Sequence, residues 1–352
     1  MKQAYRIMQD VKLLAYRAQR KPAMRFRTVL QDNSMPKLNT ASSFTRVGVM
    51  AREEATHTKA SLFELCLVLN DLAVEIAIDR KLKGMMKDYA GDQTVIHFCE
   101  RDQLSKSCDL LIVIGGDGSL LAAARAVAGT SVPVLGINRG RLGFLTDIAP
   151  ADIAQRVREV LLGDFIEETR FLLGAAIRRS PQPAMEDNVN IPADASDYGR
   201  VTLALNDIVL HPYEHVSMIE FELFINDEFV YQQRSDGLII ATPTGSTAYA
   251  LSCGGAIMHP SLNALSLVPI NAHTLSSRPI TVHGSSIIRL KPCSTNRKVP
   301  YLTADGQKPY ELPPGCEIVI EKSASFRLIH PRGYNFYETC RSKLGWAGYA
   351  YE

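Results

Sequence analysis

The stretch Asp109-Leu-Leu-Ile-Val-Ile-Gly-Gly-Asp-Gly118 decides the fold, because a fully apolar run ends abruptly in a glycine-rich turn. An Ala-rich segment, Ser119–Ala128, follows with apolar residues at helical spacing, and a second apolar run lies at Val132–Ile137. Continuous apolar runs are typical of strands in a parallel sheet that is covered on both faces. The pattern therefore predicts a strand, a helix and a second strand of an α/β domain.

The segments upstream predict the same alternation. A strand is expected at Phe44–Met50, a helix at Thr58–Asn70 and another strand at Ala73–Ile78. Alternating strands and helices of this kind build a parallel sheet. We therefore assign residues 44–146 to an α/β domain that carries the glycine-rich turn.

The sequence pattern changes after about residue 170, where short β-rich segments replace the alternation of strands and helices. The predicted strands are Val201–Leu205, Met218–Ile225, Gly237–Ala241, Ile280–Val282, Ser286–Leu290 and Glu317–Ile320. Turn residues separate them, as in Pro313-Pro-Gly315. Residues 147–330 are therefore expected to form an all-β, sandwich-like domain. Within it, Ser180–Gly199 holds three prolines and four acidic residues, which predicts a surface insertion.

Composition is that of an ordinary soluble globular protein, with 352 residues, 46% hydrophobic and 22% charged. The net charge of +2 argues against a dedicated nucleic-acid binder. Residues 1–43 nevertheless carry nine Lys/Arg against two Asp/Glu. This segment is predicted to be a disordered basic extension; a targeting presequence, an RNA- or membrane-touching arm, and an extension read from an upstream start codon are the alternatives.

The chain shows no membrane or secretion signal, because no apolar run reaches the ~18 residues that a membrane-spanning helix needs. Its seven cysteines are scattered, odd in number and never in a Cys-x-x-Cys pair. Such a pattern indicates reduced thiols rather than disulfides or a zinc site. We therefore expect a cytoplasmic location and no membrane partner.

The Gly115-Gly-Asp-Gly118 turn is the sharpest local motif. Its glycines let the backbone approach a bulky ligand, and the amides at the start of the following helix suit a phosphate. Asp117 repels phosphate, so a role as a base or metal contact beside the phosphates explains it better. A tight turn in which Asp117 caps the helix is the alternative. The P-loop and Rossmann fingerprints are both absent.

Two further segments are weaker signals. Gly136–Phe144 holds three glycines after a predicted strand, which indicates a ligand-facing loop, although an ordinary loop could look the same. The pair Asn206-Asp207 interrupts an apolar segment, which is costly unless its polar groups are hydrogen-bonded. A type I turn is the alternative at that pair.

The segment Asp236–Ser252 is the strongest signal. It offers a carboxylate, an apolar strand and then six hydroxyl side chains between Thr242 and Ser252. Hydroxyls at this density suit the sugar and polar edges of a nucleotide, with Tyr249 as a stacking face. A solvent-exposed Ser/Thr loop is the alternative reading.

In this order, the four segments closely resemble the NAD kinase family, in particular its bacterial form. The resemblance runs from about Phe44 to Trp346 and includes Arg234-Ser-Asp236, Pro260-Ser-Leu262 and His273–Pro279. Gly-Gly-Asp-Gly alone also occurs in diacylglycerol and sphingosine kinases and in phosphofructokinases. The segment Thr-Pro-Thr-Gly-Ser-Thr-Ala-Tyr that ends at Tyr249 is far more specific.

The resemblance implies an ATP- and divalent-metal-dependent enzyme, with Mg²⁺ as the expected metal, that phosphorylates the 2′-hydroxyl of the adenosine ribose of NAD to give NADP. Asp117 would be the general base, and Gly116 and Gly118 would lie close to phosphate. The residues expected to bind NAD are Asn206, Asp207, Arg234, Asp236, Thr247, Ala248, Tyr249 and Ser252. We identify no protein ligands for the metal, so it is expected to arrive with ATP.

The resemblance also implies an α/β domain joined to a β-sandwich, with the tail 331–352 returning to the first domain, and a homodimer or homotetramer. The chain departs from the family at Asp207, where Glu is common, and at Ala256 and Ala272, where proline is common. None of these three departures removes a reacting group.

Two other functions fit parts of the pattern. A lipid kinase of the diacylglycerol or sphingosine type shares the Gly-Gly-Asp-Gly motif but needs an apolar cleft for its lipid acceptor. The hydroxyl side chains of Thr242–Ser252 instead suit a polar acceptor. A catalytically inactive nucleotide sensor is the non-enzyme alternative. Retention of Asp117 argues against it, since a pure binder has no need of that base.

Overall fold

The computed structural model describes residues 43–52, 56–91, 96–140, 143–179, 199, 201–213, 217–274 and 276–346. All of them belong to one compact unit, Thr40–Glu352. The predicted basic extension, apart from Ser43, and the predicted insertion at 180–199, apart from Gly199, lie outside the described residues.

Five parallel strands form one part of the large sheet, in the order β5-β4-β1-β2-β3. They are β1 (Arg46–Ala51), β2 (Glu75–Asp79), β3 (Ile96–Cys99), β4 (Leu110–Ile114) and β5 (Pro133–Ile137). Helices α2 (Thr56–Asp71) and α5 (Ile153–Leu161) pack on one face and share one core with it. Helices α3 (Leu104–Ser107) and α4 (Asp117–Val127) bury a second core on the other face. Burial on both faces explains the continuous apolar runs of β4 and β5.

A separate antiparallel sheet has six strands in the order β13-β12-β11-β8-β15-β16. They are β8 (Asp207–Pro212), β11 (Gly237–Ala241), β12 (Ala264–Ile270), β13 (Ile280–His283), β15 (Pro300–Ala304) and β16 (Tyr310–Glu311). One face of this sheet packs against strands of the large sheet around a third core. These strands include β7 (Val201–Ala204), β9 (Ile219–Ile225), β10 (Glu228–Ser235) and β14 (Ile288–Pro292).

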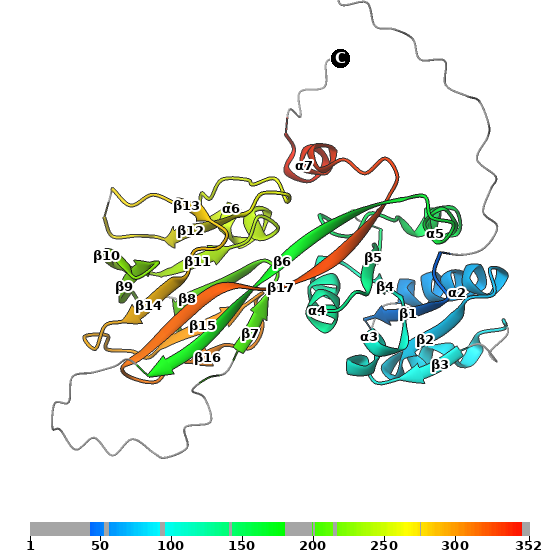
Figure 1. Cartoon of the computed structure of the whole chain (residues 1–352), viewed down its shortest axis with the longest axis horizontal. Helices are drawn as coiled ribbons and strands as arrows, with labels where there is room; N and C mark the ends of the chain where they lie inside the picture. The colour runs from blue at the N-terminus through cyan, green and yellow to red at the C-terminus, as the bar shows by residue number, and fades with distance from the viewer. Residues whose placement is uncertain are drawn as a thin grey trace, which may run out of the picture. The chain divides into compact units, whose positions relative to one another are not determined.

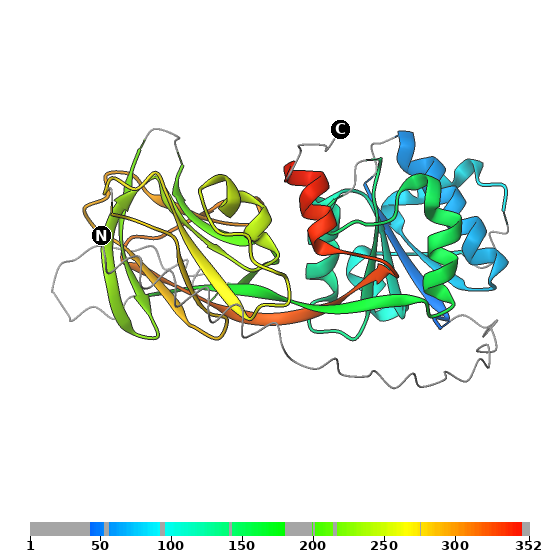
Figure 2. The same ribbon diagram turned by 90° about the horizontal axis from the view of Figure 1, so that it is seen from above.

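Two long strands, β6 (Phe165–Arg179) and β17 (Cys316–Pro331), join the two halves of the large sheet. They pair antiparallel along their length and run side by side in Figures 1 and 2. The first part of β17 also pairs with β14, and its last part pairs in parallel with β5. The parallel α/β layer and one layer of the β-sandwich are therefore parts of one continuous sheet. The predicted class, α/β plus a β-sandwich, is confirmed.

The chain ends in α7 (Phe336–Leu344), which begins at a capped position. The Asn335 side chain accepts hydrogen bonds from the amides of Tyr337 and Glu338, as expected at a helix start. The ring of Phe336 lies edge-on to His259, with centroids 5.1 Å apart. The segment that follows β17 therefore contacts the chain shortly after Thr242–Ser252, which we call the hydroxyl-rich segment.

Candidate functional site

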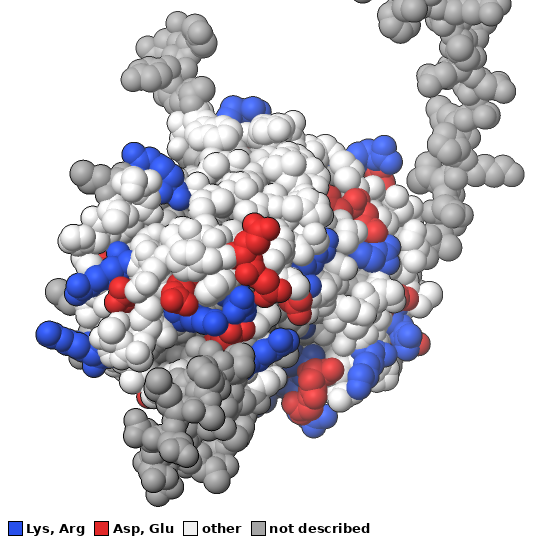
Figure 3. Space-filling view, turned by 60° about the vertical axis from the view of Figure 1, so that its left-hand side comes forward, with Lys and Arg blue, Asp and Glu red and all other residues white. Residues whose placement is uncertain are grey.

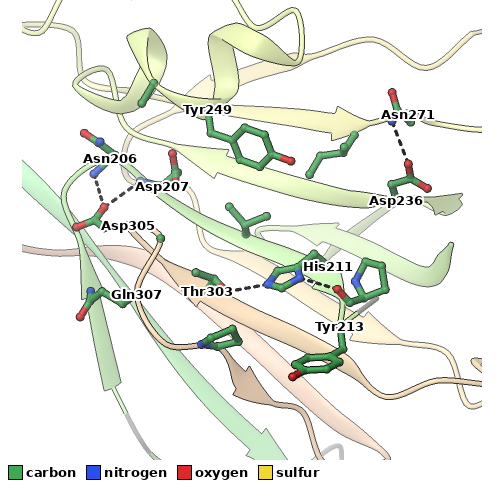
Figure 4. A pocket seen from close by; sticks show the side chains of 16 residues that line it. Asn206, Asp207, His211, Tyr213, Asp236, Tyr249, Asn271, Thr303, Asp305 and Gln307 are labelled. Carbon is green, nitrogen blue, oxygen red and sulfur yellow. Dashed lines mark hydrogen bonds between the residues drawn. The ribbon is translucent and has the colours of Figure 1, made fainter. Parts of the chain in front are cut away.

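A cavity of about 840 Å³ opens on the six-stranded sheet beside the short helix α6 (Tyr249–Ser252). Its lining residues come from segments spread over a hundred positions: Asn206, Asp207, Val209, His211, Pro212, Tyr213, Asp236, Ala248, Tyr249, Ile270, Asn271, Thr303, Asp305, Gly306, Gln307 and Pro309. Its volume lies in the range of small-molecule and cofactor sites. Three carboxylates and no Lys or Arg occur among these lining residues. We call it the acidic cavity (Figure 4).

Asp305 organises one end of the acidic cavity. Its carboxylate accepts hydrogen bonds from the amides of Leu205, Asn206 and Asp207, at 3.0, 2.7 and 3.3 Å. Figure 4 shows Asn206, Asp207 and Asp305 gathered at this end. The polar pair that interrupts the apolar segment lies where the chain passes from β7 in one sheet to β8 in the other. Asp305 thus satisfies the backbone at that crossing.

Asp207 is the most perturbed carboxyl of this cavity. Its side chain is almost fully buried. Burial, and secondarily the charge of Asp305, raises the pKa of Asp207 to about 7. An acid with this pKa exchanges its proton readily at neutral pH, which suits a group that bonds a sugar hydroxyl.

Tyr249 and Asp236 define the rest of the upper wall. The Tyr249 ring is 46% exposed and projects from α6 over the sheet, so one ring face is open to a ligand (Figure 4). At the opposite end of the cavity from Asp207, the Asp236 carboxylate accepts a hydrogen bond of 2.9 Å from the side-chain amide of Asn271. An exposed aromatic face between two carboxylates is a suitable surface for a nucleoside.

His211 forms part of the cavity floor and is held in one tautomer. Its Nδ1 lies 2.7 Å from the carbonyl oxygen of Pro212, which can only accept, so Nδ1 carries the proton. In the neutral ring Nε2 then accepts from the hydroxyl of Thr303, also at 2.7 Å. Tyr213 stacks obliquely on Tyr301 nearby, with centroids 5.0 Å apart. This end is the more aromatic part of the cavity.

The hydroxyl-rich segment mostly builds its own loop. Thr242 Oγ1 donates to the Leu205 carbonyl at 2.5 Å, and Ser246 Oγ donates to the Pro243 carbonyl at 2.7 Å. Thr244 Oγ1 accepts from the Arg170 guanidinium at 3.1 Å. These three hydroxyls are buried, so they shape the loop that presents Ala248 and Tyr249 rather than facing the cavity.

A second cavity, of about 510 Å³, lies at the glycine-rich turn. Its described lining residues are Met50, Ala51, Arg52, Lys81, Arg101, Val113, Gly116, Gly118, Ser119, Ala122 and Arg139. Four of them are cations and none is acidic, so we call it the cationic cavity. Arg101 is anchored by an ion pair of 2.7 Å with the buried Asp79. Four cations beside the first turn of α4 form a suitable site for phosphate groups.

Asp117 lines neither cavity. Its carboxylate accepts hydrogen bonds from the amides of Phe144 and Leu145, at 2.9 and 3.1 Å. A Cβ atom at Gly143 would overlap the Asp117 carboxylate, which explains the glycine in that loop. No side chain caps α4, so the alternative in which Asp117 caps the helix is not observed. Asp117 instead ties the glycine-rich turn to the Gly136–Phe144 loop.

The structure brings five of the predicted NAD-binding residues into one cavity: Asn206, Asp207, Asp236, Ala248 and Tyr249. Gly116 and Gly118 line the cationic cavity. Arg234, Thr247 and Ser252 line neither, although each lies within four residues of one that lines the acidic cavity. Their predicted roles stay predictions.

Sequence reasoning missed Asp305 and its partner Arg125. The Arg125 guanidinium, on α4, forms an ion pair with the Asp305 carboxylate. An Asp-Gly turn after a strand was the only local signal at Asp305, and such turns are common. Nothing in the spacing relates Arg125 to a residue 180 positions away.

Among the residues that the structure describes, no group of three or more His, Cys, Asp or Glu could hold a metal ion. The described side chains therefore do not fit a resident metal.

The surface of the described unit has mixed charge. On the face drawn in Figure 3, Lys and Arg side chains lie among Asp and Glu rather than forming one basic field. None of the helices within the described ranges is both long and apolar enough to cross a membrane.

A glycine-rich turn at the end of a parallel strand, with a cationic cavity beside it and a nucleotide-sized acidic cavity on a β-sandwich, defines a nucleotide-binding α/β-plus-β class of protein. Two family models identify the family within that class. The ATP-NAD kinase N-terminal domain matches residues 28–165, and the ATP-NAD kinase C-terminal domain matches residues 205–330. The chain belongs to the NAD kinase family of phosphotransferases.

Known relatives agree over most of the chain. It is 51% identical to the NAD kinase of Saccharophagus degradans over 309 residues, which is 88% of this chain and 98% of the relative. Among solved structures, the yeast NADH kinase complexed with NADH superposes with a TM-score of 0.75 at 24% identity, covering 88% of this chain and 89% of that one. An Archaeoglobus fulgidus NAD kinase in complex with ATP gives 0.61 at 24% identity, covering 85% and 97%. At that identity the two structures show a shared fold.

Proposed function

We propose that this chain transfers the γ-phosphoryl group of ATP to the 2′-hydroxyl of the adenosine ribose of NAD, giving NADP and releasing ADP. One observation supports it above the others. Helix α4 carries the glycine-rich turn of the cationic cavity at its start and, through Arg125, contacts the acidic cavity near its end. A phosphate site and a nucleoside site are thereby held by one rigid element.

The acidic cavity is assigned to NAD in this proposal. Tyr249 offers a stacking face for a base, and Asn206 and Asp207 offer polar groups to a ribose. The cationic cavity is assigned to the phosphate chain of ATP, and Gly116 and Gly118 add no side chain to the part of its wall that they form. A divalent metal carried in by ATP would neutralise phosphate charge during transfer.

Asp117 is the proposed general base for the ribose hydroxyl. Both of its oxygens accept backbone amides of the Phe144–Leu145 segment, so the proposal requires one of these bonds to be exchanged for the substrate hydroxyl. Proton removal by a positioned carboxylate typically contributes ~10²–10⁴ in rate. The in-line displacement then depends on positioning and on charge stabilisation by the cations.

The test is a coupled assay with purified protein, Mg²⁺, ATP and NAD, in which an NADP-specific dehydrogenase reports the product. We expect NADP formation that needs ATP and metal. Asp117→Asn should lower turnover ~10²–10⁴-fold while NAD still binds. Near-normal turnover in that variant would remove Asp117 from its role.

Asp109→Asn is the matched control, because Asp109 also holds two backbone amides, those of Thr45 and Arg46. It disturbs the same sheet without touching the glycine-rich turn. Phosphorylated sphingosine or diacylglycerol in a parallel reaction would support the lipid-kinase alternative instead. NAD binding without any NADP from the folded protein would indicate a sensor.

The homo-oligomer and the cytoplasmic location stay predictions from the sequence. Size-exclusion chromatography with light scattering measures the first of them directly.

A further inference from the structure

Asp305 is the most heavily bonded carboxylate of the acidic cavity. Its side chain is fully buried at the turn after β15 and accepts three consecutive backbone amides, Leu205 to Asp207. Its other contact is the ion pair with Arg125, whose side chain is 22% exposed. The residue itself has a positive φ of 48° and is followed by Gly306 at 63°. The turn is thus held in a conformation that aims the carboxylate at the crossing between β7 and β8.

We propose that Arg125 and Asp305 form a positioning pair that sets the orientation and the charge of Asp207 in the acidic cavity. The inference rests on the proposed function, because Asp207 is taken to bond the ribose of NAD. It goes beyond it by assigning a role to two residues outside the predicted site. Neither Arg125 nor Asp305 is proposed to react with the substrate.

Orientation follows from the hydrogen bonds. Asp207 is the first residue of β8, and its amide is bonded to Asp305 at 3.3 Å. The Asn206 amide makes the shorter bond, 2.7 Å, to the same oxygen. Holding two consecutive amides on one oxygen fixes the peptide plane from which the Asp207 side chain projects into the cavity (Figure 4).

Charge follows from the neighbours of Asp207. Burial is the first cause of its raised pKa of about 7, and the negative charge of Asp305 is the second. Tyr249 and Cys253, two titratable groups on which the charge of Asp207 acts, have ordinary pKa values above pH 7, and burial raises the pKa of both further, so neither adds a charge beside Asp207 at neutral pH. Arg125 is ion-paired with Asp305, so by Coulomb's law its positive charge offsets part of the negative field that Asp305 exerts on Asp207.

The two members of the pair act on Asp207 with opposite signs. Removing the cation with Arg125→Met leaves Asp305 uncompensated, so the pKa of Asp207 rises further. Removing the anion with Asp305→Asn leaves an oxygen that can still accept the backbone amides, and the pKa of Asp207 falls. Loss of structure alone would move both variants in the same direction.

The experiment measures kcat/KM for NAD between pH 5.5 and 9 in the two variants. An ionised Asp207 accepts a hydrogen bond from a ribose hydroxyl, so kcat/KM should rise with pH through an apparent pKa near that of Asp207. We expect Arg125→Met to move this limb up by about one pH unit, which lowers kcat/KM about fivefold at pH 7, mainly through KM. Asp305→Asn should move it down by a similar amount.

Arg125→Lys keeps the positive charge, so the apparent pKa of the rise in kcat/KM should stay within a few tenths of a pH unit of the wild-type value. This variant keeps the proposal testable if Arg125→Met folds poorly. Arg289→Met is the matched control, because Arg289 is also a partly buried arginine, ion-paired with Glu317 and Asp227, and none of these three residues lines either cavity. Limbs that move together, or not at all, in Arg125→Met and Asp305→Asn would overturn the proposal.

A second readout does not depend on catalysis. ¹³C NMR of carboxyl-labelled aspartate, with the Asp207 signal assigned from Asp207→Asn, follows the titration directly in protein without substrates. If no NADP forms in any variant, the proposed function fails, and the same opposite shifts in the NMR titration still test the pair.

Discussion

Asp207 shows how one residue can be costly to the fold and still useful. The side chain is buried beside a second carboxylate, and its cavity has no Lys or Arg among its described lining residues. A buried, unneutralised carboxylate favours its protonated form, and this is why the pKa of Asp207 rises to about 7. Asn has a similar shape and no charge, so at a purely structural position it would avoid the free-energy cost of burying a carboxylate.

We predict that Asp207→Asn stabilises the fold in a pH-dependent way. The unfolded Asp207 loses its proton near pH 4, whereas the folded one keeps it until about pH 7. The folded state therefore binds more protons in between, and wild-type stability falls as the pH rises from 4 to 7. Above pH 7 the variant should be more stable than wild type by roughly 2–4 kcal/mol, and near pH 4 the difference should vanish. Urea unfolding at pH 4.5 and pH 8 measures it, and an equal difference at both values would contradict the assigned pKa.

Close contact between two elements depends on Gly245, the first residue of the turn η5 (Gly245–Thr247). A Cβ atom there would overlap the backbone carbonyl of Asn206, which cannot move aside easily. We predict that Gly245→Ala lowers the free energy of unfolding by about 1–3 kcal/mol and raises KM for NAD, because the turn is pushed away from the Asn206-Asp207 crossing. Thermal unfolding and the coupled assay measure the two effects.

Gly84→Ala is the control for that variant. Gly84 lies in the 3₁₀ segment η1 (Arg80–Asp88), has no atom near the added Cβ and is not among the residues with positive φ. Its substitution should change stability by less than about 1 kcal/mol and leave KM for NAD unaltered. A similar loss in both variants would mean that the contact with Asn206 is not the cause.

Local patterns predicted the short elements well. The strand before the glycine-rich turn was expected at 109–114 and is β4 (Leu110–Ile114), and Gly237–Ala241 agrees with β11 at both ends. The long strand β17 was predicted only at Glu317–Ile320. Its middle, Glu321–Ser325, is largely exposed and polar, so no apolar periodicity marks it as strand. Its pairing with β6, which lies far from it in the sequence, decides its conformation. A short window of sequence cannot show such a pairing.

The candidate site was predicted segment by segment but not as an assembly. Asp236 and Tyr249 stood out because their motif is contiguous, and the structure places both in the acidic cavity. Asp305 carries no distinctive local pattern, although it bonds three amides of the Asn206-Asp207 segment. The hydroxyls of Thr242 and Ser246 were expected to face ligand, yet they bond their own loop. Composition shows which groups are present, whereas only the packed chain shows which of them point into a cavity.

At the scale of the whole molecule, the continuous large sheet predicts one cooperative unfolding transition. The cores on the two faces of the parallel strands and the core of the β-sandwich all include residues of β17, namely Ile329, Phe326 and Ile318. Since β17 also pairs with β5, β6 and β14, neither half can lose it and keep its own sheet intact. Calorimetric and van't Hoff enthalpies of unfolding should therefore agree for the described unit.

Two variants make that prediction specific. Phe326→Ala removes a fully buried ring from β17 and should lower stability by about 3–5 kcal/mol while keeping a single transition, because the damage is shared by both halves. Leu67→Ala removes a side chain that is 51% exposed and should leave the midpoint nearly unchanged. Trp346, the only tryptophan, lies just after α7 and gives a local fluorescence probe to compare with far-ultraviolet circular dichroism. A Phe326→Ala protein that melts in two steps would show that β17 joins the halves without coupling their stability, and the α/β and β-sandwich parts would then be independent folding units.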